Sequence, residues 1–181
     1  ENLFLDYYYG KKAAAEYVIG TRRIIQNNAP IIGHYNVNNE GSGDMYYKGA
    51  NMLHTIRQLI HNDEKWRQIL RGLNSTFYHK TVGTQEIENY ISNQSGIDLS
   101  TIFSQYLRDV RIPVLEYKIK NKALSYRWAQ VVDGFNMPVR VFINEKQQLL
   151  HPTSTWKKMT LATATTTFNV DANFYVKTKE L

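Results

Sequence analysis

With 181 residues, 13% of them aromatic, the chain can bury the core of one large or two small domains, which argues against a disordered protein. It has no cysteine, which excludes disulfides, thiolate zinc sites and a cysteine nucleophile. The formal charge is +6, but Lys and Arg are scattered singly or in pairs among acids, a pattern typical of a solvated surface rather than a nucleic-acid-binding stripe.

The N-terminal residues predict two helices. Glu1 to Tyr9 is apolar and aromatic, and Gly10 follows it as a residue that ends a helix. Lys11 to Asn28 carries an apolar side that is typical of a second helix. Residues 31–40 are expected to form an irregular connection, in which His34 is a surface or packing histidine rather than a ligand.

The segment from Asp44 to Ile60 is the centre of the helical pattern. Apolar or small residues at positions 45, 49, 52, 53, 56, 59 and 60 fall on one helical face. The turn before it, with Asp44, can cap the first free amide groups. A glycine inside a helix costs roughly 1 kcal/mol, so Gly49 predicts that another element passes very close. Tyr46 lies in the first turn, where a phenol can project into a cavity.

Three further amphipathic helices follow, and they predict an all-α region. We expect them to begin at the capping residues Asn62, Thr84 and Asp98, with Gly96 ending the second of them. The residue before Pro113 is pushed out of the helical region, which marks a boundary.

Beyond this boundary the apolar period changes from about 3.6 to 2, which indicates strands. The expected strands form a small antiparallel β-sandwich, so the predicted fold class is α+β. Their residues are 114–119, 124–128, 139–143, 148–150, 156–161, 167–170 and 174–176.

A set of motifs resembles a known family. Tyr46-x-Lys48-Gly49-Ala50, followed by a helix through Arg57, resembles the Tyr-x-Lys-Gly segment of aminopeptidase N-type zinc metallopeptidases, the gluzincins. The resemblance spans about Glu1 to Trp156, because further segments follow in the family's order: Trp66, residues 78–82, 96–99, Phe103 and 112–117. It implies that residues 1–112 are the helical C-terminal part of a thermolysin-like catalytic domain and that residues 113–181 are a β-sandwich domain.

The zinc motif of that family is missing. Its enzymes bind zinc through His-Glu-x-x-His and a later glutamate, whereas the histidines at 34, 54, 61, 79 and 151 do not have this spacing. His54 and His61 would need a third ligand, so surface or packing roles are expected for them. The chain opens at what looks like the end of the helix just beyond the third zinc ligand. We therefore expect zinc in the intact parent enzyme, but no metal and no activity in this fragment alone.

The resemblance also assigns roles to single residues. Tyr46 would donate a hydrogen bond to the oxyanion formed when a peptide carbonyl is attacked, and Tyr47 would pack. Lys48 would either place a charge near the cleft or lie on the helix surface. Glu1 would be a carboxylate that orients a metal-bound imidazole, the alternative being a frayed terminal residue.

Several expectations concern partners. The substrate of the parent enzyme would be a peptide whose N-terminal residue is removed, with no nucleic acid and no membrane segment involved. The missing N-terminal half of the catalytic domain would cover an apolar face, which self-association of the fragment could otherwise hide. The compartment is unknown, with an exported or periplasmic parent as the expectation. The alternative to an enzyme fragment is a non-catalytic peptide- or carbohydrate-binding module.

Overall fold

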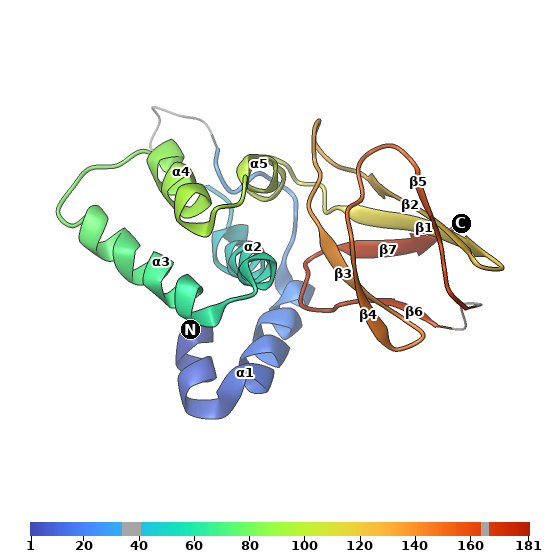
Figure 1. The fold of residues 1–181 in the computed structure, drawn as a ribbon. Coiled ribbons are helices and arrows are strands. Elements are labelled where there is room, and N and C mark those ends of the chain that lie inside the picture. Colours follow the sequence, from blue (N-terminus) through green and yellow to red (C-terminus); the bar gives the residue numbers. More distant parts are fainter. Residues whose placement is uncertain (34–40, 164–166) are drawn as a thin grey trace.

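The computed structural model describes residues 1–33, 41–163 and 167–181, in which a group of helices precedes two small sheets (Figure 1). Helix α1 spans Asn2–Gly20, and the short 3-10 helix η1 spans Thr21–Ile24. Gly10 has φ 85° and ψ 165°, so α1 consists of two helical legs joined at a kink. The break expected at Gly10 is confirmed, and glycine suits it because this φ is unfavourable for residues with a Cβ.

The second leg ends earlier than expected. Instead of continuing to Asn28, the chain leaves the helix after η1, and the backbone amides of Gln26 and Asn27 donate to the carboxylate of Asp44 at 2.9 and 2.6 Å. In a longer helix these two amides would donate to backbone carbonyl groups of the preceding turn, whereas here the Asp44 carboxylate accepts both bonds. Of the irregular connection expected at 31–40, residues 34–40, with His34, lie outside the described residues.

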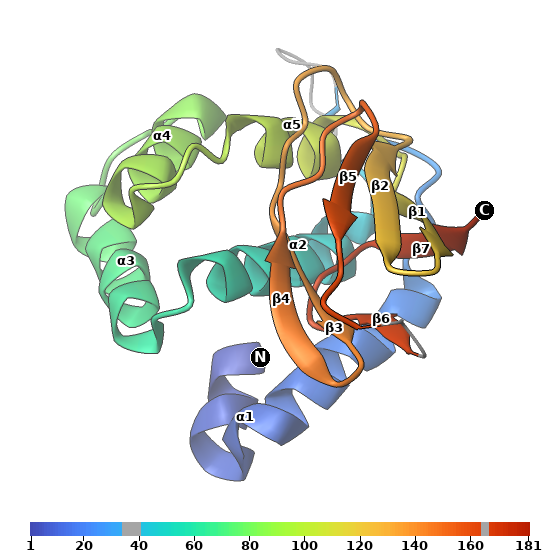
Figure 2. The same cartoon turned by 45° about the vertical axis from the view of Figure 1, so that its right-hand side comes forward.

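Helix α2, Asp44–Ile60, has the bounds predicted from the sequence. It lies between α1, α3 (Asp63–Thr76) and α5 (Ser100–Arg108) (Figures 1 and 2). Met52 and Ile56 of its apolar face are buried as expected. Much of its polar side is buried as well, including Lys48, Asn51 and Thr55. Other parts of the protein therefore cover both the apolar face of α2 and much of its polar face.

The close approach predicted at Gly49 is wrong. A Cβ added there would meet nothing within 4 Å, so the described residues leave open space beside this glycine. The close approach occurs instead at Gly72, where a Cβ would lie 2.0 Å from the hydroxyl oxygen of Tyr90. The sequence did not single out Gly72.

The remaining helices are α3 (Asp63–Thr76), α4 (Thr84–Ser95) and α5 (Ser100–Arg108). Asn62 caps α3 as expected, through a bond from the Lys65 amide to its side chain. Gly96, with φ 74°, ends α4 as expected. The cap of α4 is displaced by one residue, since Gly83 rather than Thr84 precedes it. Leu99 precedes α5, but the Asp98 carboxylate accepts a 3.0 Å bond from the amide of Ser100, the first residue of that helix, as a capping residue would. None of the helices in the described part of the chain has the length and apolarity to cross a membrane.

The strands form a four-stranded sheet in the order β5-β2-β1-β7 and a three-stranded sheet in the order β4-β3-β6. All pairs are antiparallel except β1 with β7, which is parallel and departs from the antiparallel expectation. The fold class is α+β, as predicted. The strands are β1 (Val114–Lys120), β2 (Ala123–Ala129), β3 (Val139–Ile143), β4 (Lys146–Leu150), β5 (Lys157–Thr160), β6 (Phe168–Val170) and β7 (Lys177–Glu180).

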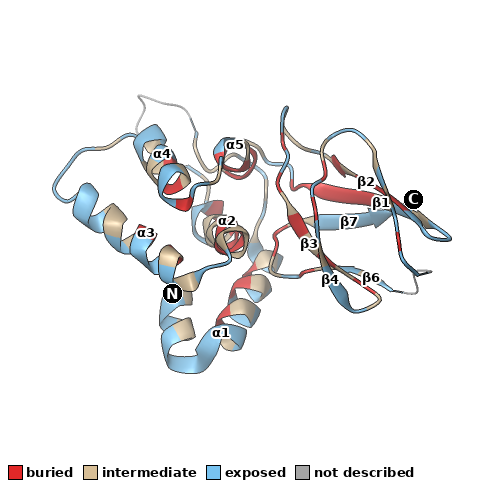
Figure 3. Cartoon of the chain, viewed as in Figure 1, coloured by how far each residue is buried: buried red, intermediate tan, exposed pale blue. Residues whose placement is uncertain are grey.

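One hydrophobic cluster runs from the helices into the sheets, and buried segments of α2, α5, β1 and β3 mark it in Figure 3. Residues 174–176, expected as a strand, instead connect the sheets to the helices through hydrogen bonds of Tyr175. Tyr175 accepts a bond from the buried Tyr106 hydroxyl at its carbonyl (2.6 Å), and its amide donates to the Thr55 hydroxyl (3.0 Å). These two bonds take the place of hydrogen bonds to a neighbouring strand, so the last strand begins only at Lys177.

Candidate functional site

Tyr46 projects from the first turn of α2 into solvent. Its side chain is 69% exposed, and no hydrogen-bond partner for its hydroxyl occurs among the described residues. The phenol borders a cavity of about 340 Å³ that is also lined by Tyr47 and Ala50 of α2. A hydroxyl in this position is a donor that remains available to a ligand.

Glu1 lies on the same cavity. Its carboxylate accepts a 2.7 Å hydrogen bond from the hydroxyl of Tyr17, and both residues line the space beside Tyr46. This bond raises the pKa of Tyr17, because losing the phenol proton would leave two negative groups in contact. Glu1 therefore contacts the second leg of α1. The structure thus brings together the two residues that the sequence singled out 45 positions apart.

The kink at Gly10 produces this arrangement, because it folds the start of α1 back towards its end. A polar cluster then holds the end of α1 to α2. The buried amide of Asn51 contacts the carbonyl of Val18 (3.0 Å) and the hydroxyl of Thr21 (3.1 Å), and its oxygen accepts from Arg22 (2.7 Å). Sequence reasoning missed this asparagine, since it falls on the polar side of the helical pattern.

The neighbours of Tyr46 have different roles from it. Tyr47 is half-buried and lines the cavity, which agrees only in part with the packing role expected of it. Lys48 is fully buried, and its ammonium donates a 2.7 Å bond to the carbonyl of Asp109 at the end of α5. Both roles considered for Lys48 are therefore wrong. At 100° per residue, position 48 lies on the opposite side of the helix from position 46.

The histidines of α2 lie apart from the cavity. His54 is buried, with Nδ1 3.4 Å from the Asn2 amide and Nε2 2.9 Å from the Asn173 side chain. Burial lowers its pKa, because the charged imidazolium loses solvation. His61 ends the helix and contacts Arg140 at 3.1 Å. Across residues 1–33, 41–163 and 167–181, no group of three or more His, Asp and Glu is arranged to hold a metal, so these residues alone do not fit a zinc site.

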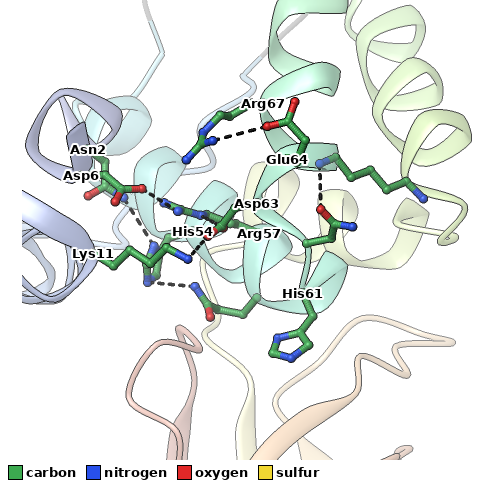
Figure 4. A network of polar contacts seen from close by, with 12 residues as sticks. Asn2, Asp6, Lys11, His54, Arg57, His61, Asp63, Glu64 and Arg67 are labelled. Atoms are coloured by element: carbon green, nitrogen blue, oxygen red, sulfur yellow. Dashed lines mark hydrogen bonds and ion pairs between the residues drawn. The ribbon is translucent and has the colours of Figure 1, made fainter.

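An ion-pair network around the buried Arg57 fixes the first leg of α1 against α2 and α3 (Figure 4). Arg57 of α2 donates to Asp6 at 2.6 Å and to Asp63 at 2.8 Å, and Lys11 also pairs with Asp63. Hydrogen bonding from Arg57 holds the pKa of Asp63 well below its usual range. This network determines where the chain before Gly10, and hence Glu1, can lie.

The same leg of α1 presents aromatic side chains to solvent. Tyr7, Tyr8 and Tyr9 are 82%, 64% and 68% exposed, and Leu3 and Phe4 beside them are also exposed. A cavity of about 550 Å³ lies between this leg and α3, lined by Leu3, Tyr7 and Leu70 among others. The exposed aromatic leg is an apolar surface next to the candidate site.

One solved structure shows the same fold over nearly the whole chain. It is the crystal structure of Legionella pneumophila aminopeptidase A in complex with aspartic acid, with a TM-score of 0.66 and 15% sequence identity. The match covers 98% of this chain but 22% of that protein, so the chain spans about a fifth of its length. No family model and no curated protein matches the sequence. The chain therefore has a fold found within an aminopeptidase.

Proposed function

We propose that this chain is part of a zinc-dependent aminopeptidase of the aminopeptidase N type, and that Tyr46 supplies its oxyanion-stabilising hydroxyl. The observation that carries the proposal is the free phenol of Tyr46 at a cavity that Glu1 also lines. The Tyr-x-Lys-Gly motif and the fold shared with an aminopeptidase support it. The exposed aromatic leg of α1 supports it as well, since the rest of a catalytic domain would cover such a surface.

The chemistry needs a donor that stays protonated. When water attacks a peptide carbonyl, the carbonyl oxygen becomes an oxyanion, and a positioned hydrogen bond stabilises it more than it stabilises the substrate. A tyrosine hydroxyl is such a donor, and its rigid ring positions the hydroxyl. A zinc ion held by residues of the parent protein outside this chain would polarise that carbonyl and activate the water.

Glu1 has a different task in this proposal. Its carboxylate is held by the Tyr17 hydroxyl at 2.7 Å, which fixes one oxygen and leaves the other for a second partner. A carboxylate fixed in this way can orient an imidazole that binds a metal. Glu1 therefore is a positioning residue, and Tyr46 is the residue that would contact the reacting atoms.

The test is Tyr46→Phe in the intact parent enzyme, assayed on an aminoacyl substrate. We expect kcat to fall by about 10²- to 10³-fold, because removing one oxyanion donor costs roughly 2.7–4 kcal/mol. Metal content and the unfolding midpoint should not change. Tyr78→Phe is the matched control, since Tyr78 is 72% exposed and lies away from the cavity, and it should leave kcat within twofold. Near-normal turnover by Tyr46→Phe would refute the assignment.

A second test uses the 181-residue chain itself. We expect it to hydrolyse no aminoacyl substrate and to bind no stoichiometric zinc. Metal analysis after dialysis against zinc, together with a peptidase assay, measures both. One tightly bound zinc per chain, or metal-dependent turnover, would contradict the division of the site between this chain and the rest of the parent.

A further inference from the structure

The four-stranded sheet gathers basic side chains on one face. Because side chains alternate along a strand, Leu115, Tyr117 and Ile119 of β1 point to the core, whereas the intervening residues point outwards. Residues paired across neighbouring strands share a face, so the register places the outward residues of β2, β5 and β7 beside those of β1. The basic face, as we call it, carries Lys118, Lys120, Arg127, Lys158, Lys177 and Lys179.

This basic face is poorly neutralised within the described chain. Its acidic residue is Glu116, which is buried under Arg127 at 2.7 Å and Lys179 at 3.9 Å. The lysines Lys118, Lys120 and Lys158 are exposed. The net charge of this face nearly equals the formal +6 of the whole chain, although its lysines look scattered when read along the sequence.

An aromatic ring lies among these cations. The Lys118 ammonium is 4.6 Å and the Arg127 guanidinium 4.8 Å from the centre of the Trp156 ring, just before β5. Tryptophan prefers the boundary between water and lipid, where its ring and its N–H both find suitable surroundings. A ring framed by two cations on a sheet is a combination suited to an anionic interface.

We propose that the basic face binds an anionic phospholipid surface. Lys118 and Lys120 are two positions apart on β1, about 6.7 Å, and so are Lys177 and Lys179 on β7. Lys158 of β5 is separated from Lys118 by Ser125 of β2, so the positive charge is spread over the width of the sheet. Such an array fits a plane of negative headgroups, which attracts each nearby Lys or Arg. A nucleic-acid duplex fits it less well, because a sheet about 14 Å wide exceeds the roughly 12 Å major groove.

The test is co-sedimentation of the 181-residue chain with vesicles at about 0.05 M salt. One set holds phosphatidylglycerol and phosphatidylcholine in equal parts, and the other holds phosphatidylcholine alone. The variant combines Lys118→Gln, Lys120→Gln and Lys158→Gln. Its matched control combines Lys12→Gln, Lys80→Gln and Lys146→Gln, which removes the same charge from exposed positions elsewhere.

We expect the chain to bind the anionic vesicles and not the neutral ones. The basic-face variant should bind roughly 100-fold more weakly, at about fivefold per lysine, whereas the control should stay within about threefold. Circular dichroism checks that each variant is folded. If the basic-face variant is unfolded, Lys177→Gln with Lys179→Gln on edge strand β7 replaces it, with an expected loss of about 25-fold.

Three results would overturn the proposal. They are absence of binding to phosphatidylglycerol vesicles, an equal loss in both triple variants, and binding to a DNA duplex that exceeds binding to the vesicles. The last result, if lost in the basic-face variant, would assign this face to nucleic acid instead.

Discussion

Replacing Arg57 with methionine tests how far the stability of the chain depends on the ion pairs of this buried arginine. The Arg57 side chain is 9% exposed and bonds to Asp6 of α1 and to Asp63 of α3, whose side chains are 12% and 27% exposed (Figure 4). Methionine keeps most of the volume of the arginine stem but removes the charge and the donors. The substitution would therefore remove the arginine from both carboxylates and leave Asp63 with Lys11 as its remaining ion-pair partner.

The expected cost follows from that burial. Breaking a buried pair by removing one partner typically costs 3–5 kcal/mol. The lower end, about 3 kcal/mol, applies here because Asp63 is partly exposed and keeps Lys11 as a partner. Arg67→Met is the matched control, since its pair with Glu64 is exposed on both sides (50% and 60%) and should cost less than about 1 kcal/mol.

Urea unfolding followed by circular dichroism and tryptophan fluorescence measures the two costs. In thermal unfolding, a loss of 3 kcal/mol corresponds to a drop of about 6–12 °C for a chain of this size. Equal costs for Arg57→Met and Arg67→Met would refute the reasoning. So would additive costs in the double variant Arg57→Met with Asp63→Asn, because partners in one network should not be independent.

Two further predictions concern single positions. In urea unfolding, Gly49→Ala should stabilise this chain by about 0.5–1 kcal/mol, because space is open beside Gly49. Gly72→Ala should destabilise the chain by about 1–3 kcal/mol, because the Tyr90 ring must move. The reverse order of the two stabilities would contradict the open space found at Gly49. His54→Gln should flatten the pH dependence of stability between pH 7 and 5. Burial lowers the His54 pKa below 6.5, so the unfolded chain binds the proton more readily and wild-type stability falls as pH drops below 6.5. The lowered pKa of Asp63 acts only below pH 3.8, so equal slopes for wild type and variant would argue against a buried neutral His54.

The features that the sequence predicted depend on residues close together along the chain. The bounds of α2 follow from its apolar period, the break at Gly10 follows from glycine chemistry, and the onset of strands after Pro113 follows from the change of period. The fold class was predictable for the same reason. The division into domains at residues 112 and 113 stays a prediction, since one hydrophobic cluster continues across it.

What the sequence did not predict depends on distant partners. The acceptor that makes Lys48 a buried residue is the carbonyl of Asp109, 61 residues away, and no periodicity identifies it. The basic face was missed because lysines that are separated along the chain become neighbours only through strand register. The role of Tyr175 likewise depends on Tyr106, which belongs to a helix rather than to a sheet.

These distant contacts also give the local motif around Tyr46 its surroundings in the structure. The motif fixes the position of Tyr46 on α2, but an exposed phenol alone has no geometry to offer a substrate. The second wall of its cavity comes from α1, which the Asn51 cluster holds at one end and Arg57 holds at the other. Because both anchors lie on the polar side of α2, mutations on this side should change the distance between Glu1 and Tyr46 without touching either residue. Helix α2 therefore positions the candidate site through polar residues, Asn51 and Arg57, that do not belong to its apolar face.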